Sequence, residues 1–173
     1  RRSRGLGDVY KRQEMDVAEA ISKLMEVKGS KSVDHFHKRL GLIMWNKVGM
    51  SRNEKGLKTA IEELKSLREE FYSDVFIPGE SNEMNSELEK ALRVADLLEL
   101  GQLMAVDALK RNESCGGHFR EEYQDEEGET LRDDKNFKFV SAWEYKGQEA
   151  TNSVLHKEEL KYEAIKIAER NYK

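Results

Sequence analysis

The chain has 173 residues, a length that suits one ordinary domain or a part of a larger protein. Charged residues make up 37% of it, hydrophobic residues 38%, and the net charge of -4 comes from interspersed signs, which argues against nucleic-acid binding. One cysteine excludes an internal disulfide framework, and no run reaches the roughly 20 apolar residues that a membrane-spanning helix needs.

Residues 1–13 form a basic segment that lacks the apolar core of a secretory signal. Residues 8–13 (DVYKRQ) resemble the translation of the transposase mosaic-end adapter that is used to prepare sequencing libraries. We therefore predict that residues 1–13 are adapter-derived, and we leave them out of the fold prediction. The same interpretation predicts that the native reading frame continues upstream and that the chain is part of a longer protein.

Two helices are predicted on either side of residue 30. The first has apolar positions at helical spacing and Gly29 as a candidate C-terminal cap: Val17, Ala18, Ile21, Leu24 and Met25. The second begins after Ser32, a candidate N-cap, and stops at Gly49. Gly41 lies inside it, where glycine costs about 1 kcal/mol relative to alanine, so we expect Gly41 to pack closely against a neighbour.

Two longer helices follow. Ser51 and Glu54 have the spacing of a capping box at the start of a third helix, whose apolar face is Leu57, Ala60, Ile61, Leu64, Leu67 and Phe71. A fourth helix is predicted from about Ser86 to Lys110. Its apolar stripe is widened by Leu97, Leu100, Leu103 and Val106, and this width predicts contact with several neighbours. Short connections between the helices predict an up-and-down bundle over residues 14–110.

Residues 111–173 predict a loop, a strand hairpin and a tail. Aromatic and small residues alternate with other residues at a period of two, which is typical of a strand: Phe137, Phe139, Ser141 and Trp143. A second alternating run from Leu160 to Ile165 predicts either the hairpin partner or a short helix. The predicted fold is therefore mainly α, an up-and-down helical bundle with a small C-terminal β-hairpin appendage.

The densest polar cluster is residues 111–123 (RNESCGGHFREEY), so its catalytic and metal-binding potential needs testing. Cys115 or Ser114 with His118 as base would form a nucleophilic pair, but no third, orienting group is evident. Zinc needs about four ligands, of which Cys115 and His118 supply two. His35 and His37 lie two residues apart on a predicted helix and point in different directions.

A structural role fits the cluster better. Charge-assisted hydrogen bonds can lock the end of the fourth helix to the loop that follows it. Gly116 and Gly117 permit a tight backbone path, and they follow a helix instead of a strand, unlike a phosphate-binding loop. We therefore predict no catalytic, cofactor-binding or metal-binding residue, and a structural motif made of Arg111, Glu113, Ser114, Gly116, His118 and Arg120.

The same cluster resembles the R-x-E-S-R-G-x-H-x-R-x-D/E pattern near the end of the flavoprotein subunits of succinate dehydrogenase and fumarate reductase. The matching positions are Arg111, Glu113, Ser114, Gly116, His118, Arg120 and Glu122. Cys115 stands where the family usually has an arginine, so a local ion pair of that arginine is in doubt here. The resemblance covers Glu14 to Lys173, and the pattern is shared in part with L-aspartate oxidase.

The resemblance implies the C-terminal helical part of an enzyme that interconverts succinate and fumarate. In that family FAD and the catalytic residues lie upstream of this region, which implies a fragment without an active site or FAD, inactive alone. The resemblance further implies an iron–sulfur subunit that receives electrons, a membrane anchor subunit beyond it, and a peripheral position on the cytoplasmic side of the bacterial inner membrane.

Two alternatives stay open. One is the C-terminal region of L-aspartate oxidase, a soluble flavoenzyme on the same scaffold that has no iron–sulfur partner. The other is a free-standing helical interaction module. The strand segment and long tail after His118 favour the dehydrogenase/reductase interpretation. The direction of the physiological reaction depends on the flavin potential, the quinone and the partner, none of which is encoded in this chain.

Overall fold

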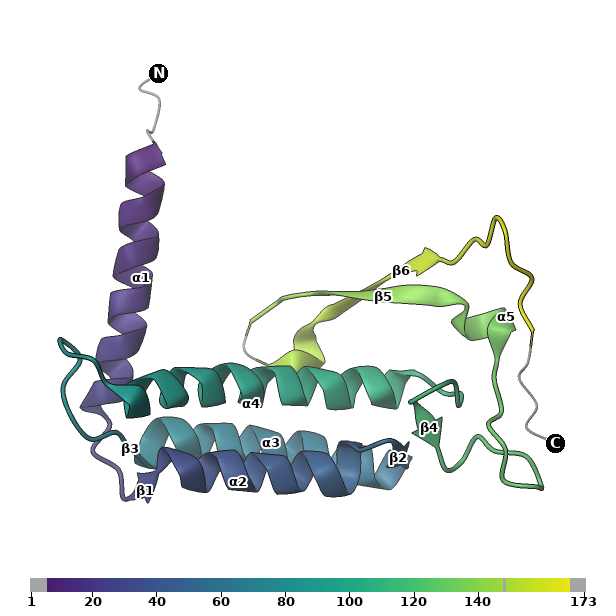
Figure 1. Cartoon of the computed structure of the whole chain (residues 1–173), viewed down its shortest axis with the longest axis horizontal. Coiled ribbons are helices and arrows are strands. Elements are labelled where there is room, and N and C mark those ends of the chain that lie inside the picture. The colour runs from purple at the N-terminus through teal and green to yellow at the C-terminus, as the bar shows by residue number, and fades with distance from the viewer. Residues whose placement is uncertain (1–5, 148, 169–173) are drawn as a thin grey trace.

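The computed structural model describes residues 6–147 and 149–168. Figure 1 shows α2 (Val33–Ile43), α3 (Glu54–Asp74) and α4 (Ser86–Lys110) lying side by side, while α1 (Leu6–Glu26) projects away from one end of them. A ribbon made of β5 (Phe139–Glu144) and β6 (Val154–Glu159) lies along α4. The start of the predicted adapter-derived segment, residues 1–5, and the end of the tail, residues 169–173, lie outside the described residues.

Helix α2 begins where the sequence predicts, and its π-helical continuation ends at the predicted stop. The hydroxyl of Ser32 accepts a hydrogen bond from the backbone N–H of His35 at 3.3 Å, which satisfies one of the free donors of the first turn. The helix continues as a π-helix, η1 (Met44–Val48), and stops at Gly49. Its inner face buries Val33, Phe36 and Leu40.

The predicted capping box of α3 is wrong. Asn53 is the N-cap, and its side-chain oxygen accepts from the N–H of Gly56 at 2.8 Å. Ser51 is unavailable as a cap because it lies in an extended pair, β2 (Ser51–Arg52), and its hydroxyl donates to Glu121 at 3.0 Å. The predicted apolar face of α3 is confirmed, since all of its members are buried: Leu57, Ala60, Ile61, Leu64, Leu67 and Phe71.

Helix α4 has the predicted bounds, and the side-chain oxygen of Asn85 caps it by accepting from the N–H groups of Glu87 and Leu88. The prediction that α4 contacts several neighbours is confirmed, since it packs against α2, α3, η1 and the short helix η2 (Ala150–Asn152), although Leu97 and Leu100 on the same stripe are exposed. The face that packs against α2 and α3 instead contains small residues, which let the backbones approach closely. Its buried members are Leu88, Ala91, Val94, Leu98, Gly101, Gln102, Ala105, Val106 and Ala108.

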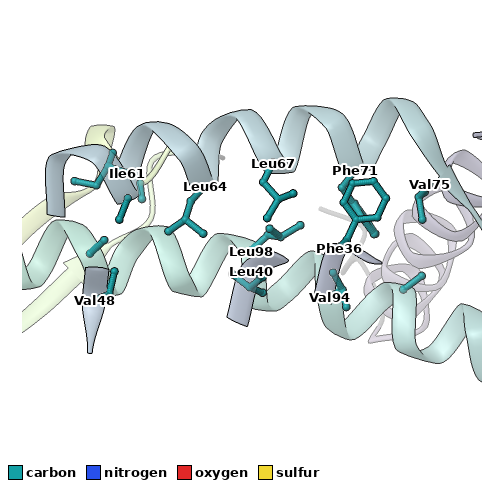
Figure 2. Packing of buried hydrophobic residues seen from close by; sticks show 14 of the residues in the cluster. Phe36, Leu40, Val48, Ile61, Leu64, Leu67, Phe71, Val75, Val94 and Leu98 are labelled. Carbon is teal, nitrogen blue, oxygen red and sulfur yellow. The ribbon is translucent and has the colours of Figure 1, made fainter. Parts of the chain in front are cut away.

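Helices α2, α3 and α4 share one hydrophobic core (Figure 2). Phe36 and Phe71 meet edge to face with their ring centroids 5.3 Å apart, a favoured aromatic geometry. Leu64 and Leu98 are both completely buried in the same core. Burial of each such leucine stabilises the packing of the three helices by about 1.5–3 kcal/mol.

Two glycines have different roles from those predicted. Gly29 does not cap α1; a Cβ atom at this position would lie 2.0 Å from the backbone of Asp74. It permits the crossing at which β1 (Lys31–Ser32) pairs in parallel with β3 (Val75–Phe76). The prediction that Gly41 packs closely is wrong, since a Cβ there would meet no atom within 4 Å. The close contact occurs at Gly101 instead, where a Cβ would lie 3.1 Å from the sulfur of Met44.

Helix α1 is longer than predicted, and between Tyr10 and Glu26 it packs against the core only near its C-terminal end. Leu24 is buried, and Ile21 and Met25 pack against the core, whereas the side chains from Tyr10 to Ala20 are exposed. The predicted border between residues 13 and 14 falls inside this helix. The adapter origin of residues 1–13 and the division at residue 110 stay predictions.

The predicted β-hairpin is present, but its second strand was misplaced. In β5 the predicted alternation is confirmed, with Phe139, Ser141 and Trp143 partly buried. Its partner is β6, in antiparallel register with Phe139 opposite Glu159. The run 160–165 follows β6 without forming a strand or helix. Phe137 belongs to a single helical turn, α5 (Asp134–Phe137). The fold is mainly α with a small β-hairpin, as predicted, and no helix in the described ranges is long and apolar enough to cross a membrane.

Candidate functional site

The polar cluster of residues 111–123, which we call the junction, is organised around a buried arginine. Arg120 lies on a short strand, β4 (Phe119–Arg120), and is 1% exposed. Its Nη1 donates to the backbone oxygens of Ala108 at 3.0 Å, Leu109 at 3.3 Å and Arg111 at 3.4 Å. These carbonyls end α4 and have no partner inside the helix, so the guanidinium caps the helix and compensates its negative end.

Ser114 holds the backbone of Arg120 in place. Its buried hydroxyl donates to the carbonyl oxygen of Arg120 at 3.0 Å and accepts from the N–H of the same residue at 2.8 Å. The Nε of Arg120 donates to Glu122 at 3.1 Å, and the guanidinium lies 5.4 Å from the ring centroid of Tyr123. The arginine is thus positioned from both its backbone and its side chain.

Glu113 connects the junction to the segment that leads into the hairpin. This carboxylate is 2% exposed, and one oxygen accepts from Arg111 Nε at 2.8 Å and Nη2 at 2.7 Å. Its other oxygen accepts from the N–H of Asp133 at 2.8 Å. Arg111 also donates to the carbonyl oxygen of Phe137 at 3.1 Å. A buried charge needs such a full set of partners, because an unpaired one is strongly destabilising.

His118 closes a tight turn. Its backbone and that of Cys115 exchange two hydrogen bonds, of 2.8 and 3.1 Å, and the turn requires Gly116 at a φ of +59°. The ring Nε2 donates to the carbonyl oxygen of Arg111 at 2.9 Å. Burial lowers the pKa of His118 below its usual value; the hydrogen bond to Arg111 opposes this, and the nearby arginine charges add to the lowering. The neutral ring is therefore the favoured form.

Sequence reasoning missed the part of the site that comes from the start of α3. Strand β2 pairs in parallel with β4, and the Nη2 of Arg52 donates to the carbonyl oxygen of Gly117 at 3.4 Å. The carboxylate of Glu121 accepts from Ser51 at 3.0 Å and from Asn53 at 2.8 Å.

The neighbouring carboxylate of Glu122 accepts from the N–H of Glu54 in the first turn of α3. Desolvation acts to raise the pKa of Glu122, but the hydrogen bonds from the Glu54 N–H and from Arg120 outweigh it and lower that pKa. Negatively charged side chains are favourable at the positive N-terminal end of a helix, so the adjacent pair Glu121 and Glu122 could have been predicted to lie at a helix start. However, a separation of 68 residues between Glu54 and Glu122 hides their pairing from local patterns.

The hairpin is fastened to the bundle at two further points that the sequence did not reveal. Trp143 donates from its indole Nε1 to Asp107 on α4 at 2.7 Å. In the connection that follows β5, at the same end of the ribbon, Glu149 accepts from the buried Arg68 of α3 at 2.7 Å, and Arg68 also donates to Gln102 at 3.3 Å. Leaving such a polar group without its partner inside the protein costs free energy, so these hydrogen bonds favour this one position of the hairpin on the bundle.

The polar groups of the junction are engaged with its own backbone. Within the described part of the chain, no hydrogen bond joins the ring of His118 to Ser114 or Cys115, and no group of three His, Cys, Asp or Glu side chains could hold a metal ion. The structure brings together all six residues of the predicted motif. The hydrogen bonds of the junction join three segments: the end of α4, the start of α3 and the residues that precede the hairpin.

A cavity of about 830 Å³ lies between α1 and the bundle, and its lining residues can be compared with those that FAD requires. Its volume suits a sizeable ligand, but a dinucleotide needs backbone or cationic donors for its pyrophosphate. Lys23 and Arg68 are the basic residues of the lining, and Arg68 is already paired with Glu149. The acidic residues outnumber them: Asp16, Glu19, Glu69, Asp96 and Glu149. These residues do not fit FAD.

Comparisons with known proteins agree on one family. The model of the fumarate reductase flavoprotein C-terminal region matches residues 37–172. A fumarate reductase flavoprotein subunit of Serratia is 31% identical over 125 residues, which is 72% of this chain and 20% of that protein. An uncharacterized FAD-dependent oxidoreductase of Methanocaldococcus jannaschii is 30% identical over 110 residues, or 64% and 19% of the two chains. The chain thus spans about a fifth of the length of these relatives.

Solved structures show the same fold. A quinol-fumarate reductase with menaquinol molecules matches with a TM-score of 0.76 and 25% identity, over 95% of this chain and 27% of that one. A quinol fumarate reductase variant of E. coli matches with a TM-score of 0.75 and 24% identity, over 96% and 27%. The likeness therefore includes the bundle, the junction and the hairpin together.

Proposed function

The chain belongs to the family of C-terminal regions of fumarate reductase flavoproteins, and we propose that it is the C-terminal helical part of a subunit that interconverts succinate and fumarate. The observation that carries this proposal is the extent of the match: residues 37–172 include two helices of the core completely, the junction and the hairpin. A chance likeness of one helix pair would not extend through the buried Glu113, Ser114 and Arg120 to the ribbon beyond them.

In this proposal the chain has a scaffolding role, and FAD and the catalytic residues belong to the preceding part of the flavoprotein. The hydrogen bonds of the junction support a scaffolding role. Both oxygens of Glu113 and the hydroxyl of Ser114 are bonded within the chain, so they are occupied in holding segments together. The acidic cavity beside α1 also does not suit a dinucleotide. We therefore propose that the chain alone is inactive and holds no FAD.

The proposal includes partners of the whole flavoprotein. An iron–sulfur subunit would accept electrons from the flavin, and a membrane anchor subunit would connect that subunit to quinone. The flavoprotein would then lie peripherally on the cytoplasmic side of the bacterial inner membrane. Support comes from the solved neighbours, which are quinol fumarate reductases by name.

A chimera tests the proposed function. Residues 37–172 would replace the matching region of the Serratia flavoprotein subunit, and fumarate reduction would be measured with a reduced viologen dye that donates electrons directly to the flavin. We expect an FAD-loaded, active chimera, and an inactive protein when the region is deleted. A stable, FAD-loaded chimera without turnover would contradict the proposal. So would stoichiometric flavin binding by the isolated chain.

A further inference from the structure

An apolar groove runs between α2 and α4 on the outside of the bundle. It has a volume of about 210 Å³ and is lined by His37, Leu40, Gly41, Met44, Leu97, Leu100, Gly101 and Met104. On its α4 side Leu97, Leu100 and Met104 are 42%, 51% and 50% exposed. These are the residues of the broad α4 stripe that the core leaves unused.

The composition of this groove differs from that of the rest of the chain. Aspartate, glutamate, lysine and arginine make up 37% of all residues, yet none of them lines the groove. Single exposed apolar residues are ordinary on a protein surface, but a contiguous apolar patch marks a site of interaction. Leu97, Leu100 and Met104 follow one another at helical spacing, so they form one continuous strip along α4.

The α2 side of the groove has open space at Gly41 and an exposed tryptophan, Trp45, next to it. A Cβ at Gly41 would meet nothing within 4 Å, so the groove floor is open there. Trp45 lies one helical turn beyond Gly41 and is 84% exposed. It belongs to the π-helix η1, a type of distortion that is frequent at functional sites. Exposed tryptophan beside an apolar groove is the composition of an interface hot spot.

We infer that this groove docks the preceding, flavin-binding part of the flavoprotein, an inference that rests on the proposed function. The length of the relatives supports this occupant, since the matched region is only 20% of the Serratia subunit and about four-fifths of that subunit lies outside it. A covalently linked neighbour has a high effective concentration, so even a small apolar face suffices to hold it. Contacts between domains of one chain are typically of this modest kind.

Thiol accessibility tests the inference. Cys115 would first be replaced by serine, and single cysteines introduced as Leu100→Cys in the groove and Lys58→Cys on the exposed face of α3. Each variant would be made both in the isolated chain and in the chimeric Serratia subunit, and its reaction rate with a maleimide measured. We expect Leu100→Cys to react at least about tenfold more slowly in the chimera than in the isolated chain, because a buried group reacts only when the structure opens. Lys58→Cys should react equally in both.

Equal rates for Leu100→Cys in the two proteins would overturn the inference. Protection that appears only after addition of the iron–sulfur subunit would also overturn it, in favour of that subunit as the occupant. Protection in the isolated chain that grows with protein concentration would identify a second copy instead. Failure of the proposed function is a separate observation: the chimera would protect Leu100→Cys and still fail to reduce fumarate.

Discussion

Trp143 on the hairpin donates a hydrogen bond to Asp107 on α4, at 2.7 Å from indole Nε1 to carboxylate oxygen. The inward residues of β5 are only partly buried, and its outward residues are exposed. Two-stranded ribbons are marginal in water unless they pack against something. The position of the turn end of the ribbon along α4 therefore depends on this bond and on the nearby Arg68–Glu149 pair.

Replacing Trp143 with phenylalanine keeps an aromatic ring but removes the donor. We expect the hydrogen exchange of the β5 amides to speed up, and a stability loss of about 1–2 kcal/mol, because Asp107 loses its partner. Hydrogen exchange followed by mass spectrometry measures the first effect and urea denaturation the second. Val140→Thr, on the exposed face of the same strand, is the matched control. Unchanged exchange in Trp143→Phe would show that the ribbon is held by other contacts.

Truncation of the core leucines should be costly. Leu64→Ala and Leu98→Ala each remove a completely buried side chain, so we expect losses of about 2–5 kcal/mol in the free energy of unfolding. Leu97→Ala, one residue away on α4 but exposed, should stay within about 0.5 kcal/mol. Equal effects of Leu97→Ala and Leu98→Ala would mean that the faces of α4 are wrongly assigned.

Arg120→Lys should weaken the junction although the charge is kept. A lysine ammonium cannot reach the carbonyls at the end of α4 and Glu122 at once, as the planar guanidinium does. We expect a loss of about 2–4 kcal/mol in unfolding free energy, since buried acceptors lose their donor. Arg93→Lys, on the exposed face of α4, serves as the control. A wild-type midpoint for Arg120→Lys would rule out the capping role.

The stability contribution of His118 should depend on pH. Burial, with the help of nearby arginine charges, lowers its pKa in the folded chain below the unfolded value of 6.5. The unfolded chain therefore binds more protons between these two values, so stability is lost as the pH falls from about 6.5 towards the folded pKa. His118→Gln, which keeps a donor for the Arg111 carbonyl, should have a flatter profile. Urea midpoints from pH 8 to pH 5 measure the difference, and parallel profiles would contradict it.

Deleting residues 1–13 should leave the melting temperature unchanged within error. The side chains of residues 10–13 are exposed, and the packed part of α1 begins only near Ile21. Among residues 10–13, the deletion removes no buried side chain from α1. Circular dichroism during heating provides the measurement. A decrease of several degrees would show that the segment packs, and the adapter interpretation would then lose its structural support.

The sequence by itself determined the helices of the bundle and the hydrophobic face of α3. It did so because the spacing of apolar residues and the N-cap at Ser32 are local signals, read within one or two turns. The motif of residues 111–123 was also visible as a string, including the glycine that a left-handed turn needs at Gly116.

Only the tertiary structure decided which side of the broad α4 stripe is buried and what the motif residues bind. Leu97 and Leu98 are equally apolar, and the approach of α2 and α3 alone makes the second one core. The partners of Arg120, Glu121 and Glu122 come from α4 and from the start of α3, up to 70 residues away. Such pairs leave no periodic trace in the sequence, because the distance between the partners is set by the packing of whole helices and not by their spacing along the chain.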